Sequence, residues 1–202
     1  MEAVKISGYT ATIFEELYVL PAPVTTNTFT TITQVNAKAA TAIPRCIIPA
    51  GAFSAIGKSH YFRARGTVQS AAGTATFIFT GGLDVAGGTL LKTMFATPAL
   101  TLPTGTAVFD IEGDLTAQAV GQAGSTIQCN GSMRVGGSTA NAWETGLAAT
   151  TTTTVGAQML FSNSITTLDN EAPQFLDLFC TCSASSATNQ IILQQLKLYG
   201  EN

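Results

Sequence analysis

The chain has few of the residues on which catalysis and nucleic-acid binding depend. Charged residues make up 10% of its 202 residues, and it has one histidine and one tryptophan. With a formal net charge of −3, it lacks the basic surface with which proteins bind nucleic acid. At 46% hydrophobic residues it is too apolar for a disordered chain, and too sparsely charged for a long charged helix. The composition predicts a folded domain without a nucleic-acid partner.

Long hydrophobic runs and a secretory signal are missing as well. Thr, Gly and Ser interrupt every apolar stretch before it reaches the roughly 18 residues of a membrane-spanning helix. The start, Met1 to Lys5, does not combine a basic segment with a following apolar run. We therefore expect no membrane partner and synthesis in a cytosol.

Cysteines are too few for a disulfide-stapled scaffold of this length. The four are Cys46, Cys129, Cys180 and Cys182. Only one residue separates the last two, which is too short a spacing for a zinc knuckle. On a strand their side chains would lie roughly 7 Å apart, too far for an easy disulfide. We predict buried or half-buried thiols and no metal site.

Catalytic motifs are absent from the sequence. His60 could join a serine and either Asp110 or Asp177 in a triad, but there is no Gly-x-Ser-x-Gly elbow. Three glycine pairs do not fit a phosphate-binding loop, and we interpret them as turns. These pairs are at 81–82, 87–88 and 136–137. The sequence thus predicts no catalytic residue and no cofactor.

One group of acids is the exception. Asp110, Glu112 and Asp114 recur at every second position of a predicted strand and so share one face. Such a set could serve glycoside hydrolysis or hold a hard cation such as calcium. The alternative is a solvated outer face in which an arginine on a neighbouring strand pairs with an acid. The arginines available for this are Arg63, Arg65 and Arg134.

From Val24 onward the sequence alternates short β-type segments with turns and shows no helical period. The expected strands are 24–35, 42–48, 60–68, 74–80, 90–96, 107–115, 125–135, 155–161, 175–182 and 190–199. In the last, Ile191, Leu193 and Tyr199 would share one face and Ile192, Leu196 and Leu198 the other. Residues 138–154, with Trp143, are expected to form a loop. About ten strands without helices predict an all-β, two-sheet antiparallel sandwich.

Residues 1–23 have a different pattern from the domain at 24–202. Their apolar residues follow a helical stripe, and prolines end it at 21 and 23. The stripe consists of Tyr9, Ile13, Phe14, Leu17 and Tyr18. One interpretation is an N-terminal arm with one or two helical turns, and the other is a strand that joins the core. Both remain open at this point.

Turn and strand motifs over about residues 24–200 follow a recurrent pattern. They are Ile48-Pro49-Ala50-Gly51-Ala52-Phe53, Ile56-Gly57-Lys58, Tyr61 to Thr67, Thr74 to Phe79, Phe109 to Thr116, Gly121 to Gly124, Gly131 to Gly136 and Asn189 to Leu198. This pattern resembles the jelly-roll domain of surface proteins of tailed bacteriophages, of the head decoration, head fibre or minor tail type. The resemblance implies a TNF-like jelly roll that assembles as a homotrimer on the outside of a virion.

As a function, the resemblance implies a non-enzymatic capsid decoration protein that binds the major capsid protein. Residues 1–23 would be the docking or inter-subunit arm, with a candidate interface at Ile13, Phe14, Leu17 and Tyr18. Exposed apolar residues would serve subunit contacts. We expect these to include Phe53, Phe95, Leu100 and Leu102.

Two alternatives stay open. A tail or head-fibre adhesin that binds a host glycan or receptor would need exposed aromatic residues close together, such as Trp143 near Tyr61 or Tyr199. A glycoside hydrolase would use Asp110 or Glu112.

Overall fold

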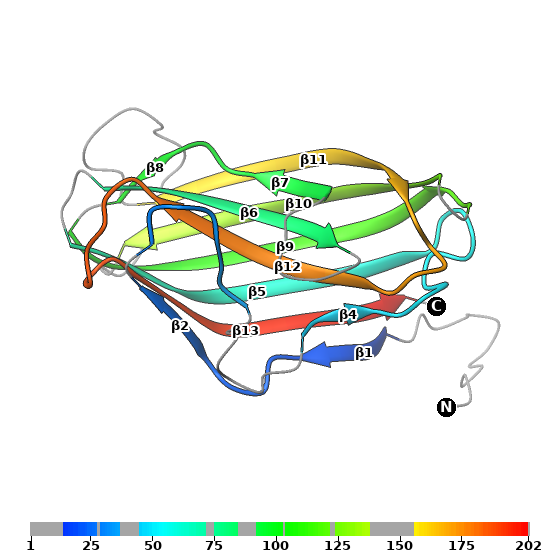
Figure 1. Cartoon of the computed structure of the whole chain (residues 1–202), viewed down its shortest axis with the longest axis horizontal. Helices are drawn as coiled ribbons and strands as arrows, with labels where there is room; N and C mark the ends of the chain where they lie inside the picture. The colour runs from blue at the N-terminus through cyan, green and yellow to red at the C-terminus, as the bar shows by residue number, and fades with distance from the viewer. Residues whose placement is uncertain are drawn as a thin grey trace, which may run out of the picture.

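The chain folds into two antiparallel β-sheets packed face to face (Figure 1). A computed structural model describes residues 14–27, 29–36, 45–71, 75–84, 92–102, 104–121, 124–137 and 156–201. In these ranges all regular structure is strand, and no helix long and apolar enough to cross a membrane is found. The predicted all-β sandwich is confirmed.

The larger sheet has seven strands in the described residues. Its order is β1 (Phe14–Val19), β13 (Gln190–Glu201), β5 (Ser59–Ser70), β9 (Gly105–Ala119), β10 (Ser125–Gly137) and β11 (Gly156–Leu168), with β2 (Val24–Asn27) also on β13.

The smaller sheet has six described strands. Its order is β3 (Thr33–Gln34), β12 (Gln174–Cys182), β6 (Thr76–Asp84) and β7 (Lys92–Ala96), with β4 (Ile47–Ile48) on β12 and β8 (Leu100–Thr101) on β6.

Successive segments of the chain change sheet repeatedly. The chain runs from β2 to β3 and β4, back to β5, across to β6–β8, back to β9–β11, across to β12 and back to β13. This wrapping of one chain around two sheets is the jelly-roll pattern. Strands β10 and β11 form an additional pair that widens the larger sheet beyond β9 (Figure 1).

For residues 14–19 the strand interpretation is confirmed and the helical one is wrong. Strand β1 pairs with β13 from Phe14 opposite Glu201 to Val19 opposite Lys197. The exposed edge of β13 has backbone groups that need partners, and this non-local demand outweighs a short helical stripe. Leu17 and Tyr18 are half-buried and pack against the core, whereas Ile13 lies outside the described residues.

Several predicted strand limits need correction. The segment 24–35 is divided between β2 in the larger sheet and β3 in the smaller. Gly81–Gly82 and Gly136–Gly137 are not turns but lie within β6 and β10. The pair at 87–88, residues 42–44 and the expected loop at 138–154 lie outside the described residues.

A bulge in β13 overturns the predicted faces of residues 190–199. The register with β5 shifts between Leu193 and Gln195, so the side-chain alternation changes phase there. Four leucine or isoleucine side chains therefore all point into the core, and Tyr199 points outward with Lys197. The buried four are Ile191, Leu193, Leu196 and Leu198.

Glycines opposite phenylalanines shape the core between the sheets. Four inward glycines each lie directly across from a phenylalanine of the neighbouring strand, whose ring occupies the space that a Cβ would need. The pairs are Gly66 with Phe109, Gly113 with Phe62, Gly131 with Phe161, and Gly81 with Phe95. Glycine is thus required at these strand positions by close approach.

Phe95 links the two sheets. Its ring stacks on Phe161 at 4.5 Å and on Phe62 at 6.5 Å between centroids. The expectation that Phe53, Phe95 and Leu102 are exposed is therefore wrong: all three are buried, because they fill the interior of the sandwich. Leu100 is half-buried and packs against the same core.

The four cysteines are buried and free, as predicted. Burial first, and then the charge of Asp114, raises the pKa of the Cys129 thiol to about 12. Within the described ranges no group of three or more His, Cys, Asp or Glu could hold a metal ion.

The Gly131–Phe161 pair gives a stability test. A Cβ at Gly131 would lie 2.2 Å from the backbone oxygen of Glu112 and 2.5 Å from the Phe161 ring. Because the backbone of β9 cannot move away cheaply, we expect Gly131→Ala to lower the free energy of unfolding by about 3 kcal/mol. Chemical denaturation measures this loss.

The matched control is Gly124→Ala, where a Cβ would meet nothing within 4 Å. This variant should stay within about 0.5 kcal/mol of the parent protein. Equal stability of the two variants would show that the ring does not need the space above Gly131.

Candidate functional site

The outer face of the larger sheet brings together the charged residues that the sequence singled out. Alternation along β5 and β9 turns Phe62 and Phe109 into the core, so Tyr61, Arg63 and Asp110 point away from it. The antiparallel register sets Arg65 opposite Asp110, and Arg63 opposite Glu112. This face is the candidate functional site.

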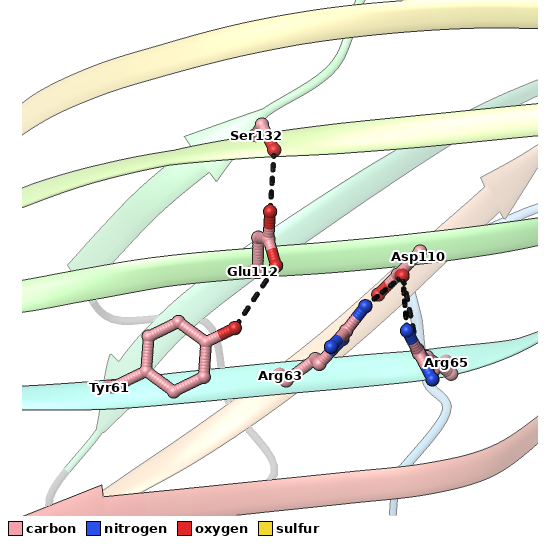
Figure 2. A network of polar contacts seen from close by, with 6 residues as sticks. All are labelled: Tyr61, Arg63, Arg65, Asp110, Glu112 and Ser132. Carbon is pink, nitrogen blue, oxygen red and sulfur yellow. Dashed lines mark hydrogen bonds and ion pairs between the residues drawn. The ribbon is translucent and has the colours of Figure 1, made fainter. Parts of the chain in front are cut away.

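Asp110 is bound by two arginines. Arg63 donates from Nε to Oδ1 at 3.0 Å and from Nη2 to Oδ2 at 2.6 Å, which is a two-point contact (Figure 2). Arg65 Nε also donates to Oδ2, at 3.0 Å. The predicted salt bridge from a neighbouring strand is confirmed for both arginines of β5. Charge-assisted, two-point contacts of this kind fix the carboxylate in one orientation.

Glu112 is held by hydroxyl groups on both sides. Tyr61 on β5 donates from its hydroxyl to Oε2 at 3.0 Å, and Ser132 on β10 donates to Oε1 at 3.5 Å (Figure 2). Burial and then the hydrogen bond to Glu112 raise the pKa of Tyr61 from 10.0 to about 12. Glu112 thus connects three neighbouring strands through uncharged donors.

An aromatic pair lies beside this network. Tyr61 and Tyr199 are directly opposite each other on β5 and β13, with ring centroids 6.1 Å apart. Lys197 Nζ lies 5.9 Å from the centroid of the Tyr199 ring and 3.7 Å from the Glu16 carboxylate. Both tyrosines are half-buried, so part of each ring faces solvent. Trp143, the other aromatic residue considered for such a cluster, lies outside the described residues.

His60 belongs to the interior. Its side chain is 5% exposed and its ring packs edge-on against Phe53, with centroids 4.7 Å apart. Phe53 is in turn fixed by Asn170, which accepts from its backbone N–H and donates to its carbonyl. The single histidine is therefore part of the packing beneath the segment 48–58.

Asp177, a triad candidate in the sequence, has a different role in the structure. It is fully buried on β12, where Gln34 Nε2 donates to Oδ1 at 2.7 Å and Asn36 Nδ2 at 3.2 Å. Arg45 forms an ion pair with Oδ2, and its guanidinium lies 4.4 Å from the Phe175 ring centroid. Asp177 thus attaches the segments before and after the undescribed residues 37–44 to the smaller sheet.

Two of the four candidate interface residues, Leu17 and Tyr18, have side chains that the structure describes, and these two lie outside the network. Leu17 and Tyr18 pack against the core from β1, and burial raises the pKa of Tyr18 to about 12. The structure describes the backbone of Phe14 in β1, but Ile13 lies outside the described residues.

Comparisons with known proteins do not assign the chain to a family. No family model matches the chain, and no curated protein matches it. Among solved structures it is similar to the CBM2 module of Lactobacillus casei BL23 phage J-1 evolved Dit. The two are 11% identical with a TM-score of 0.38, over 96% of this chain and 98% of that chain. A likeness this weak implies nothing about what this chain binds.

The Tyr61–Glu112 bond gives a prediction for titration. Replacing the acid in Glu112→Gln removes the charge that favours the neutral phenol, so the pKa of Tyr61 should fall from about 12 toward 10.0. Tyr18, raised to about 12 by burial and by Cys46, should keep its midpoint and serves as the internal control. NMR titration of labelled tyrosine rings separates the two.

The raised pKa of Tyr61 also makes the stability of the protein depend on pH. Since this pKa is about 12 in the folded chain and 10.0 ordinarily, the stabilisation from the neutral phenol is fully present below pH 10. The free energy of unfolding should then fall as the pH rises from 10 to about 12. If the Tyr61 midpoint is the same in the parent protein and in Glu112→Gln, the hydrogen bond does not contribute to the shift.

Proposed function

We propose that the chain is a non-enzymatic virion structural protein of a tailed bacteriophage, which decorates the outer surface of the head by binding the major capsid protein. The observation that carries this proposal is that two carboxylates on the outer face are already bound by side chains of the same chain. Asp110 is occupied by Arg63 and Arg65, and Glu112 by Tyr61 and Ser132. The jelly-roll architecture and the sequence motifs over 24–200 support it.

These contacts argue against glycoside hydrolysis as the alternative. A general acid must deliver a proton to the glycosidic oxygen, and the second carboxylate must attack or activate water. Before Asp110 could take part in either step, it would have to give up its contacts with two guanidinium groups. The acids are arranged to join strands, which suits a rigid building block.

A protein that binds to the outside of a capsid needs a surface that fits the shell and that has few uncompensated charges. A protein contact loses free energy when charged groups are stripped of water without a partner. On this sheet the charges of Asp110, Arg63 and Arg65 are already compensated within the chain. Each copy bound across neighbouring capsid subunits would add its binding free energy to the stability of the shell.

The test is made on purified phage particles. We expect the chain to be present on heads, and particles stripped of it to lose resistance to heat and to low salt, which added purified chain should restore. Electron microscopy with a labelled antibody gives the location. Particles that keep the same resistance without the chain would reject stabilisation, and label confined to tails would reject the head location.

A second candidate function, adhesion to a host glycan, is favoured by the Tyr61–Tyr199 pair. The apolar C–H faces of sugar rings pack on aromatic rings, and sugar hydroxyls hydrogen-bond to charged groups. Both kinds of partner are present here, since Lys197 lies beside the Tyr199 ring and Glu112 beside Tyr61.

This candidate predicts a specific mutational effect. If the purified chain binds a glycan, Tyr199→Ala should weaken binding roughly tenfold or more, because it removes one ring of the pair. Val108→Ala is the control, since Val108 is exposed on the same face of β9 and lacks an aromatic ring. Glycan arrays followed by calorimetry measure the effect, and equal affinities of the two variants would exclude this pair as the binding site.

A further inference from the structure

The two outer edges of the larger sheet differ in how they are protected. At one edge, β1 has Glu15 and Glu16, and its register with β13 shifts between Glu16 and Tyr18. Pro21 and Pro23 then separate β1 from β2 along the same strand. Charges, prolines and bulges are the features by which natural sheets prevent pairing with another chain. This edge is therefore blocked.

The opposite edge, β11, has none of these charges or prolines. Strand β11 spans 13 residues, Gly156–Leu168, without a charged residue or a proline. In the part of the chain that the structure describes, its backbone pairs only with β10, and the one register shift lies at the end of the strand, beyond Ile165. Figure 1 shows β11 on the far side of the sheet from β1.

The side chains of β11 include large apolar groups that are exposed or only half-buried. Leu160 is 82% exposed, the largest value among the exposed large hydrophobic side chains of the described residues. Its neighbours Met159 and Phe161 are only half-buried, although both pack against the core. An exposed apolar side chain in the middle of an unprotected edge is typical of a strand that has a partner.

We propose that β11 pairs antiparallel with β11 of a second copy of this chain, about a twofold axis at Leu160. The two larger sheets then form one continuous sheet. In this register Leu160 faces its own counterpart, and Met159 faces Phe161. The pairing satisfies the backbone groups of the edge and buries the most exposed apolar side chain of the described residues.

A second copy suits this edge better than a partner of opposite charge. Around a twofold axis each residue faces a residue of the same short strand, so any charge near the axis would meet a like charge. Strand β11 has no charge of its own, and the Lys92 ammonium of β7 contacts it only at Thr167, seven residues from the axis. No charge of β11 therefore opposes self-pairing at Leu160 or would attract a charged segment of another protein there. The arrangement relates copies two at a time, and we propose it in place of the homotrimer that the sequence resemblance implies.

The experiment uses the full chain in sedimentation equilibrium over a range of concentrations. We expect the parent protein to be a dimer. Leu160→Lys places two ammonium groups at the axis and should raise the dimer dissociation constant roughly a hundredfold or more. Val108→Lys is the matched control, since Val108 is an exposed apolar residue of the same sheet on β9, away from the edge. It should remain a dimer.

A crosslink tests the register directly. Leu160→Cys should form a disulfide between two chains on mild oxidation, whereas Val108→Cys should not. The four natural cysteines are buried and do not compete. Because both positions are exposed, neither substitution should disturb folding. Circular dichroism verifies that both variants are folded.

Three results would overturn the proposal. They are a monomeric or trimeric parent protein, a Leu160→Lys variant that associates as the parent does, and an absence of crosslinking through position 160 in a protein that dimerises. A monomeric parent that acquires a strand from another virion protein would assign the edge to a different occupant. None of these results bears on whether the chain is found on phage heads, so the proposed function is tested separately.

Discussion

Phenylalanine rings that lie on glycines fix how neighbouring strands pair within each sheet of this protein. In each of four pairs the ring covers backbone of the neighbouring strand, at a place where any Cβ would collide with it. Phe95 then extends from the smaller sheet to stack on Phe161 and Phe62 of the larger one. Aromatic rings therefore take part in the contact between the two sheets, together with the buried leucine, isoleucine and valine side chains of the core.

The polar outer face depends on this inner packing. Side chains of a strand alternate between faces, so a slip of one residue would exchange the buried and exposed sets. With Phe62 and Phe109 held over Gly113 and Gly66, β5 and β9 can adopt only one register. That register brings Arg63 and Arg65 onto Asp110, and Tyr61 onto Glu112 (Figure 2). The network is therefore a consequence of the core as much as of its own charges.

The features that could be predicted from the sequence are those carried by long, regular strands. The alternation in β5, β9 and β10 places acids and arginines on one face, which is enough to predict a salt bridge between strands but not that Asp110 is the acid that forms it. What remained unpredictable depends on residues distant in the sequence. Gly81 has the propensity of a turn residue, but the ring that keeps it in a strand belongs to β7.

The same reason explains the other differences. The helical stripe of residues 9–18 is a local signal, whereas the free edge of β13 that captures β1 is formed by the other end of the chain. The bulge in β13 has no distinctive sequence, so the phase of Leu196 and Tyr199 could not be predicted. The partners of Asp177 come from positions 132 to 143 residues away, so no short sequence motif could predict them.

The distribution of charge across the larger sheet connects these observations. Charged side chains are found on β1, β13, β5 and β9, where each strand has a charged neighbour that can compensate it, and on β10 only Arg134 remains. Strand β11 has none. An isolated charge at the free edge would have no cross-strand partner in its own chain and would repel its copy in a second chain. Within the described ranges, the charges on the outer face of the sheet are therefore compensated by neighbouring strands, and the one edge strand without a charge is β11.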